Sequence, residues 1–301
     1  MPATSAPEQI LHRLDWQVLR RLDGLLQGDY RSLFHGSGLD LAALREYQPG
    51  DDVRYIDWSV TARMGTPYVR EYLEDREITA WFLLDLSPSV DFGTVRPERT
   101  KRTVLIDFVT TLARMLTRRG NRVGALFYAS QVEQTLPARG GRLQVLRLVE
   151  ELLAQPSLER SPLTDLRPLL EIAYRTIKRR SVVILVSDFI SQPGWERPLS
   201  LLDRRHEVLA VRLLDPREME LPDVGPVILE DAESGETLYV DTHDAGLRDR
   251  FQVAARAREA ALGEAFGRAG IDAVSLSTDE DLVRAIVRMA MLRKRRRPGR
   301  R

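Results

Sequence analysis

The sequence predicts an α/β protein built on a doubly wound, mainly parallel sheet. Runs rich in Val, Ile and Leu alternate with amphipathic helical patterns, and two of these runs end directly in an aspartate. Strands that alternate with helices form parallel sheets whose two faces are both covered. With 301 residues, 43% of them hydrophobic and 30% charged, the chain is long enough to bury a full core and is typical of a globular protein.

The N-terminal quarter differs in pattern from the rest. Apolar residues that recur with a period near 3.6 predict a helix over 8–27. The segment 36–75 is dense in charge, glycine and aromatic residues, contains the turn signal "QPGDD", and alternates like a strand in "TPYVREYL". We therefore expect residues 1–76 to form an N-terminal helix followed by a β-rich arm.

The α/β pattern occupies residues 77–292. "ITAWFLLD" and "SVVILVSD" are typical of buried central strands, and "GPVILEDAESGETLYVD" predicts a hairpin inserted before a long helix. Further strands are predicted in the stretches "RVGALFYA", "QVEQTLPA", "HEVLAVRLL" and "IDAVSLS". Helices are predicted at 103–120, 142–154, 165–179 and 245–268, with a last one starting at Thr278.

Side chains with oxygen atoms follow the two central strands. Asp85 ends the first strand and is followed at alternate positions by Ser87 and Ser89, whereas Asp188 ends the second strand. The carboxyl ends of parallel strands meet at one edge of the sheet, and Thr164 in "SPLTDL" could add another hydroxyl there. Such oxygen ligands suit Mg²⁺ or Mn²⁺. The pattern predicts a metal site, although Asp, Ser and Pro are also ordinary turn residues.

This arrangement resembles the metal-ion-dependent adhesion site of von Willebrand factor A domains. In that family the serines and the threonine bind Mg²⁺ directly or through water, and an acidic residue of a partner completes the coordination. The resemblance implies a non-enzymatic, metal-dependent interaction module whose ion is held by Asp85, Ser87, Ser89, Thr164 and Asp188. The sequence departs from the family pattern at Phe189, where glycine is common, and at Pro162 and Leu163, where a glycine pair is common.

A second resemblance covers the segment upstream of the α/β pattern. "LREYQPGDDVRYIDWSVTARMGTPYVREYLEDRE" is similar to the signature of the family catalogued as domain of unknown function number fifty-eight, where it precedes a von Willebrand A-like domain. "LLDPREMELPDVG" and "LEDAESGE" also resemble that family's later pattern. Such proteins are commonly encoded beside MoxR-type AAA+ ATPases and are thought to act with them in chaperone-like maturation or assembly. The resemblance therefore implies a MoxR-type ATPase and an acidic client protein as partners.

The signature segment carries many charges around Trp58, which we expect to be the apolar anchor of an ion-pair network. In one interpretation the network folds the arm onto the α/β domain, and in the other it forms a docking surface for the ATPase. Acid catalysis by the adjacent carboxylates at 51 and 52 is not favoured, because neighbouring residues on a turn point apart. The candidate docking residues are Arg45, Asp51, Asp52, Arg54, Asp57, Trp58 and Arg63.

The last residues, 293–301, form a basic tail that we expect to be disordered and solvated. Nucleic-acid binding through this tail is an alternative function. We do not favour it, because no aromatic residues accompany the charges as base-stacking platforms would.

Several other function classes lack their signatures. The sequence contains no "GxxxxGK[ST]", "GxGxxG" or "HExxH" motif, and its histidines are widely separated. A metal-dependent hydrolase or phosphatase that uses Asp85 is an alternative, but a phosphatase of the haloacid dehalogenase type would need a second aspartate where Ser87 stands. With no cysteine, no secretory leader pattern and no apolar run of roughly 18 residues, we expect a cytoplasmic protein without a membrane span.

Overall fold

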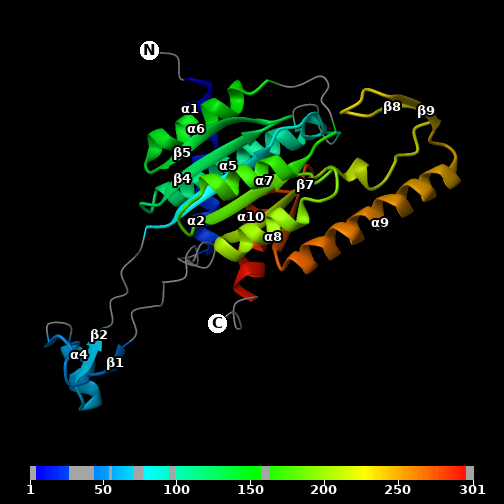
Figure 1. Ribbon diagram of the computed structural model, residues 1–301. Helices are drawn as coiled ribbons and strands as arrows, with labels where there is room; N and C mark the ends of the chain where they lie inside the picture. Colours follow the sequence, from blue (N-terminus) through cyan, green and yellow to red (C-terminus); the bar gives the residue numbers. More distant parts are fainter. Residues whose placement is uncertain are drawn as a thin grey trace.

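The computed structural model describes residues 5–26, 44–53, 56–70, 77–94, 99–156 and 163–295. A six-stranded sheet in the order β10-β7-β6-β3-β4-β5 forms the centre (Figure 1). Its strands are β3 (Thr79–Asp85), β4 (Arg122–Tyr128), β5 (Val132–Arg139), β6 (Val182–Ser187), β7 (Glu207–Leu214) and β10 (Asp272–Ser277). β5 pairs antiparallel with β4, and the other neighbouring strands pair in parallel. The prediction of a doubly wound, mainly parallel sheet is confirmed.

The strand order reverses between β3 and β6. From β3 the chain builds outward through β4 and β5, then crosses back to β6 and continues through β7 to β10. The carboxyl ends of β3 and β6 therefore lie side by side at the point of reversal, where sheets of this kind bind their ligands. Asp85 and Asp188 come from these two ends.

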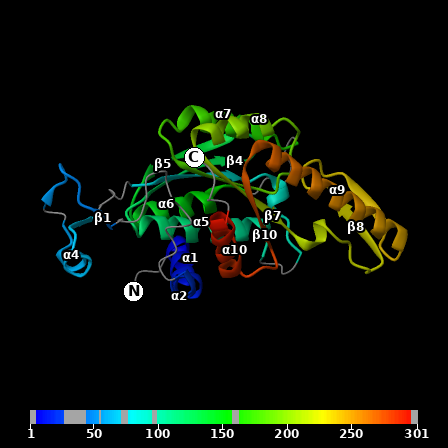
Figure 2. The same ribbon diagram turned by 90° about the horizontal axis from the view of Figure 1, so that it is seen from below.

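Helices cover both faces of the sheet (Figure 2). One face packs against α7 (Leu166–Thr176), α8 (Glu196–Arg205) and α9 (Ala245–Ala269). The other packs against α5 (Lys101–Thr117), α6 (Arg142–Ala154) and α10 (Leu282–Arg295). The sequence did not predict α8, whose Pro198 stands in the first turn, a position at which helices tolerate proline.

Alternate residues of β3 enter two separate cores. Phe82 and Leu84 join the core beneath α5, whereas Trp81 and Leu83 join the core beneath α7. Successive side chains of a strand point to opposite faces, so a strand covered on both sides is a continuous apolar run. Each fully buried side chain of this size contributes roughly 2 kcal/mol, and together they position Asp85 at the sheet edge.

The N-terminal helical segment is part of the α/β core. It consists of α1 (Ala6–Leu14), the π-helical turn η1 (Asp15–Leu19) and α2 (Arg20–Leu26), which confirms the predicted helix. Leu11, Leu14 and Leu22 are buried in the same core as the inner side of α5. The structure thus shows this segment packed on the α/β domain, while the division of the chain at residue 76 stays a prediction.

Residues 44–53 and 56–70 form a small unit, here called the signature unit, that stands apart from the α/β domain in Figure 1. β1 (Leu44–Glu46) pairs antiparallel with β2 (Tyr68–Arg70), and α4 (Trp58–Met64) lies between them in sequence. Asp57 caps α4 by accepting the backbone N–H of Ser59 at 3.0 Å. Trp58 is 69% exposed, so the expectation of an apolar anchor is wrong. A unit with such short elements has little interior in which to bury an indole.

The predicted hairpin before α9 is present. β8 (Pro226–Glu230) pairs antiparallel with β9 (Thr237–Asp241), and Ile228 lies opposite Tyr239. Figure 1 shows the hairpin at the margin of the α/β domain, close to the start of α9. Its short strands extend no sheet of the domain, so the hairpin is an appendage to the fold.

The last helix begins later than the sequence predicts. α10 starts at Leu282, and the carboxylate of Asp281 caps it by accepting the backbone N–H of Arg284 at 3.1 Å. Thr278 lies in the turn after β10, where its hydroxyl donates to Asp215 at 2.7 Å. Thr278 is therefore used as a loop contact and not as the helix cap.

The same helix extends into the predicted basic tail. Arg293 lies within α10, is buried, and forms an ion pair with Glu207 at the start of β7. Residues 296–301 lie outside the described residues, so the expectation of a solvated tail stays a prediction for them.

Candidate functional site

Asp85 is fully buried at the carboxyl end of β3. Its Oδ1 accepts the backbone N–H of Ser87 at 3.0 Å, and its Oδ2 accepts the hydroxyl of Ser187 at 2.6 Å. The 3-10 turn η3 (Pro88–Asp91) then brings Ser89 back, so that its Oγ lies 3.2 Å from Oγ of Ser87. The structure brings Asp85, Ser87 and Ser89 together, and their role as metal ligands stays a prediction.

The surroundings raise the pKa of Asp85 to about 6. Burial is the largest cause, because it penalises the charged carboxylate, and the negative charge of Asp188 adds to it. The hydrogen bonds from Ser187 and Ser87 act in the opposite direction. Two carboxylates held this close at one strand edge favour a positive charge beside them.

Asp188 follows β6 directly and is fully buried. Lys101, the first residue of α5, is 1% exposed, and its Nζ donates to Oδ2 of Asp188 at 2.6 Å and to Oε1 of Glu218 at 2.5 Å. Burial alone would lower the pKa of Lys101, but the charges of Asp188 and Glu218 outweigh burial and raise it. An ammonium group that the sequence did not nominate therefore already neutralises the second predicted aspartate.

Phe189, immediately after Asp188, has a φ of 55°. Residues with a bulky side chain rarely adopt this left-handed conformation, and glycine is common at this position in von Willebrand A domains. The ring of Phe189 packs with centroid distances of 5.4 Å to Trp195 and 4.9 Å to Phe266. This aromatic packing offsets the backbone strain, so the turn is kept without glycine.

Thr164 lies just before α7 and is nearly fully buried. Its backbone N–H donates to Oε2 of Glu233 at 2.8 Å, and its hydroxyl donates to Oε1 of the same carboxylate at 2.5 Å. Glu233, in the turn of the β8–β9 hairpin, is 5% exposed. Burial raises the pKa of Glu233, whereas the hydrogen bonds from Thr164 lower it. The hydroxyl of Thr164 thus serves a residue that the sequence analysis did not nominate.

Carboxylates outnumber positive charges at this strand edge. Asp188 and Glu218 bond to Lys101, and the charge of Asp188 acts on two further buried carboxylates, Asp85 and Glu233. Arg212 is a second buried cation here: its Nε donates to the backbone carbonyl of Asp188 at 3.4 Å, its charge acts on Asp188 and Glu218, and it also forms an ion pair with Glu259 of α9. An excess of buried negative charge favours a cation.

The donor set at this edge fits Mg²⁺ or Mn²⁺. Among the described residues, no group of three or more His, Asp or Glu side chains is arranged to hold a metal. An ion would therefore need hydroxyl ligands, which Ser87 and Ser89 offer beside Asp85 and Thr164 offers where it meets Glu233. Such a set of hard oxygen donors suits these two cations. Asp188 adds charge, but its Oδ2 is already bonded to Lys101.

The residues of this edge that the sequence analysis missed are Lys101, Ser187, Glu218 and Glu233. Ser187 had a signal, because it directly precedes Asp188 at the end of the same strand. Glu218 and Glu233 lie in "LLDPREMELPDVG" and "LEDAESGE", the two later stretches that carry the family resemblance. Lys101 had no signal, since it opens an ordinary amphipathic helix.

The candidate docking residues that the structure describes lie in the signature unit. Arg45 forms a two-point ion pair with Asp51, with both N–O distances at 2.7 Å. Asp52 is half-buried and Arg63 is exposed, whereas Arg54 lies outside the described residues. The Arg45–Asp51 pair thus represents the predicted ion-pair network in the described part of the unit.

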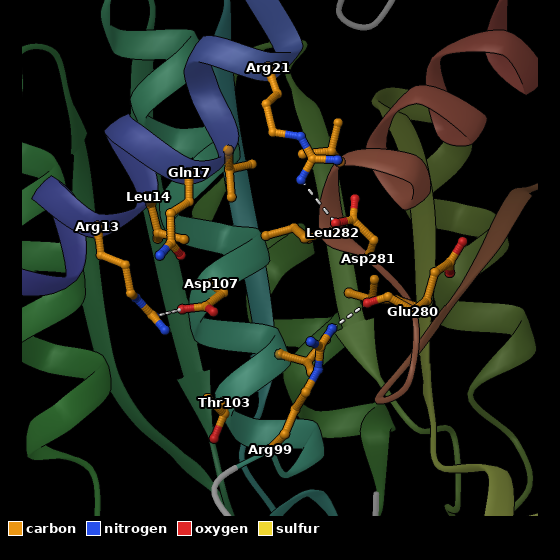
Figure 3. Close-up of a pocket in the computed structure, with 14 residues that line it drawn as sticks. Arg13, Leu14, Gln17, Arg21, Arg99, Thr103, Asp107, Glu280, Asp281 and Leu282 are labelled. Atoms are coloured by element: carbon orange, nitrogen blue, oxygen red, sulfur yellow. Dashed lines mark hydrogen bonds and ion pairs between the residues drawn. The ribbon is translucent and has the colours of Figure 1, made fainter. Parts of the chain in front are cut away.

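A separate cavity of about 350 Å³ lies between the N-terminal helices and the start of α10 (Figure 3). Its charged side chains are paired within the chain: Arg13 bonds to Asp107 at 2.5 Å, Arg21 bonds to Asp281 at 3.0 Å, and Arg99 donates to a backbone carbonyl. These charges are satisfied, and the cavity shares no residue with the strand edge. We therefore do not take the cavity as the candidate site. Across the described part of the chain, each helix is too short or too polar to cross a membrane.

Several solved structures are similar in fold at low sequence identity. An aerotolerance-related membrane protein of Bacteroides fragilis matches with a TM-score of 0.48 and 11% identity, over 72% of this chain and 99% of that chain. BatB of Bacteroides thetaiotaomicron matches with a TM-score of 0.47 and 14% identity over the same shares. The manganese-loaded TRAP protein of Plasmodium vivax matches with a TM-score of 0.33 and 18% identity, over 45% of this chain and 57% of that chain. At these values the fold class rests on the strand order of this chain itself.

Relatives and a family model identify the family. Uncharacterized proteins of Mycobacterium bovis and Mycobacterium tuberculosis are each 39% identical over 285 residues, which are 95% of this chain and 89% of the relative. The model of the family described as "Protein of unknown function DUF58" matches residues 43–261, from the signature unit into α9. The resemblance seen in the signature segment is confirmed, and the chain belongs to the DUF58 family.

Proposed function

We propose that this chain is a non-enzymatic protein-interaction module whose contact site is the strand edge around Asp85. The observation that carries the proposal is the cluster of buried carboxylates that meet at Asp188, which itself bonds to Lys101. This cluster lies where the strand order reverses, which is the place at which doubly wound sheets bind ligands. The resemblance to the adhesion site of von Willebrand A domains supports the same edge.

In this proposal Asp85, Ser87, Ser89 and Thr164 hold Mg²⁺ or Mn²⁺. Asp188 contributes negative charge, while Lys101 fixes its position. When bound, the metal supplies a positive centre that attracts an anionic group of a partner. The burial of Asp85 and Ser87 keeps water away from this contact and strengthens it.

The proposed partners are a MoxR-type AAA+ ATPase and an acidic client protein, as the family resemblance implies. The strand edge would take a carboxylate of the client. The signature unit would dock the ATPase, and the 69% exposure of Trp58 supports this part, since exposed aromatic residues are frequent hot spots of protein interfaces. The two partners would then contact different parts of the chain.

Metal titration with a matched pair of variants tests the site. Chelator-treated protein is titrated with Mg²⁺ by calorimetry and with Mn²⁺ by electron paramagnetic resonance. Asp85→Asn keeps the shape of the side chain and should abolish saturable binding, because it removes the carboxylate charge nearest the serines. Asp165→Asn is the control, since Asp165 is the neighbour of Thr164 but acts as the N-cap of α7, a role that asparagine also fills.

Saturable binding in the parent and the control, lost in Asp85→Asn with circular dichroism unchanged, is the expected result. If the parent binds neither ion by either method, the metal part of the proposal is wrong. If Asp85→Asn binds the ions as tightly as the parent does, the site lies elsewhere.

A further inference from the structure

The tip of the β8–β9 hairpin is built to direct Glu233 inward. The carboxylate of Asp231 accepts the backbone N–H of Glu233 at 3.0 Å and that of Ser234 at 2.7 Å. Gly235, with a φ of 71°, closes the turn, and the backbone N–H of Asp231 donates to the carbonyl of Glu236 at 2.9 Å. Ser234 and Glu236 are exposed, whereas Glu233 is 5% exposed. A surface turn therefore buries one carboxylate.

Glu233 and Thr164 meet in a two-point contact. Thr164 offers two donors, its backbone N–H and its hydroxyl, and each of them bonds to a different oxygen of Glu233. A carboxylate is the side chain that accepts at both oxygens and donates at neither. Thr164 thus presents the hydrogen-bonding pattern of a carboxylate-binding subsite, and its burial strengthens these charged hydrogen bonds.

The charge of Glu233 is poorly suited to simple anchoring of the hairpin. Asp188 is also buried and repels it, because both side chains bring negative charge to the same edge. A neutral acceptor at this position would tie the hairpin to Thr164 without bringing another negative charge to the edge. The geometry instead matches a ligand carboxylate that enters a site with an affinity for carboxylates.

A movement of the hairpin away from the domain would expose little buried apolar surface. Ile228 is 58% exposed, Leu238 is 62% exposed and Tyr239 is 78% exposed, so these side chains are not packed into the cores of the domain. Segments with few buried apolar contacts open at low free energy. Exchanging Glu233 for another carboxylate would also replace two hydrogen bonds by two equivalent ones.

We propose that Thr164 is a carboxylate-binding subsite of the strand edge, that Glu233 is its tethered occupant, and that a glutamate or aspartate side chain of a partner replaces Glu233 when the hairpin moves away. This inference rests on the proposed function and names the chemistry of the ligand that the site takes. The tether holds Glu233 at an effective concentration of about the millimolar range or higher. A free carboxylate therefore competes poorly in the parent chain and binds readily once Glu233 is removed.

The test follows the backbone amide of Thr164 in the full chain by hydrogen exchange and nuclear magnetic resonance. The variants are Glu233→Ala and, as a matched control in the same turn, Glu236→Ala. Glu233→Ala should speed exchange at Thr164 and in β8 and β9 by about tenfold, since two charge-assisted hydrogen bonds are lost. Acetate should restore the protection of Thr164 in Glu233→Ala and leave the parent and Glu236→Ala unchanged. Acetamide, which has the same shape without the charge, should restore nothing.

The inference is overturned if Glu233→Ala exchanges like the parent, if acetate gives no protection, or if acetamide protects as well as acetate. The experiment is run with a chelator and repeated with Mn²⁺, whose binding is followed in the same samples. Acetate protection without any Mn²⁺ binding would support the subsite and contradict the metal part of the proposed function. Mn²⁺ binding without acetate protection would keep the proposed function and overturn the subsite.

Discussion

Two ion pairs of this chain use similar side chains in opposite surroundings. At the strand edge, the side chains of Lys101 and Asp188 are 1% and 0% exposed, whereas those of Arg45 and Asp51 in the signature unit are 35% and 18% exposed. Removing one partner of the buried pair leaves a charge that water cannot reach. Removing one partner of the surface pair leaves a charge that water solvates.

This difference in burial determines what substitutions in each region can test. Substitutions at the strand edge test the stability of the α/β domain as well as the site, because buried charges there hold several elements together. Substitutions in the signature unit change the surface and leave those elements untouched. Loss of partner binding is therefore easier to interpret in the signature unit than at the strand edge.

The largest expected effect is that of Lys101→Met. Methionine fills much of the same volume but leaves Asp188 and Glu218 without their cation, so we expect a loss of about 3 to 5 kcal/mol in the free energy of unfolding. Urea unfolding followed by circular dichroism measures this loss. Adding Asp188→Asn to Lys101→Met should recover part of it, because one of the unpaired charges is then removed.

A surface pair provides the control for Lys101. Arg118 and Asp23 are 49% and 52% exposed and lie 3.5 Å apart, so Arg118→Met should change the free energy of unfolding by less than about 1 kcal/mol. Equal losses in Lys101→Met and Arg118→Met would show that the buried pair is solvated in solution, and the contrast between the two regions would fail.

Phe189 offers the next largest effect. Phe189→Ala removes the ring from between Trp195 and Phe266 and keeps the left-handed backbone, so we expect a loss of about 3 kcal/mol. Phe189→Gly removes the same ring but relieves the backbone, and it should be more stable than Phe189→Ala by about 1 kcal/mol. The urea midpoints of the two variants measure this difference in stability. If Phe189→Gly is the less stable of the two, the backbone at this position is not strained.

The sequence predicted the fold where local pattern and burial agree. The runs that became β3 and β6 are apolar on both faces, and a strand between two helical layers needs that composition. The predicted start of α10 was wrong, because Thr278 and Asp281 are both residues that commonly cap helices. What decides between them is the contact of Thr278 with Asp215 of a distant loop, which no local pattern reveals.

The pH dependence of folding stability tests the burial of a histidine that lies away from the candidate site. His206 lies between α8 and β7, is 3% exposed, and has a pKa lowered from 6.5 to about 4 by burial and by Arg205 and Arg180. Below about pH 6.5 the unfolded chain binds a proton that the folded chain refuses, so stability falls as the pH drops toward about 4. Between about pH 7 and about pH 5 this loss should be about 2 kcal/mol.

His206→Leu removes the titrating group and should lose less stability over the same pH range than the parent does, by that amount. Urea unfolding of both proteins at the two pH values gives the comparison. A pH dependence that is equal in the two proteins would mean that His206 is hydrated in the folded state.

The site could be predicted only in part, for a physical reason. Asp85 and Asp188 stand at strand ends, and because the carboxyl ends of parallel strands meet at one edge, the strand pattern alone predicts that they lie close together. Lys101 and Glu233 reach the same edge from a helix start and from a hairpin turn. Their positions depend on how those elements pack in three dimensions. The ion pair of Lys101 with Asp188 and the hydrogen bonds of Thr164 with Glu233 therefore could not be predicted from the sequence.

The smallest effect on stability is expected at Trp58. Because its side chain is 69% exposed, Trp58→Ala should leave the urea midpoint of the α/β domain unchanged. If the signature unit docks a MoxR-type ATPase, the same variant should weaken that binding by at least about tenfold, as is usual for an interface hot spot. Met64→Ala is the matched control, since Met64 is 60% exposed on the same helix. Binding is measured by surface plasmon resonance with the ATPase immobilised. Parent-like binding by Trp58→Ala would remove the indole from the docking surface and leave the charges around Arg45 to carry it.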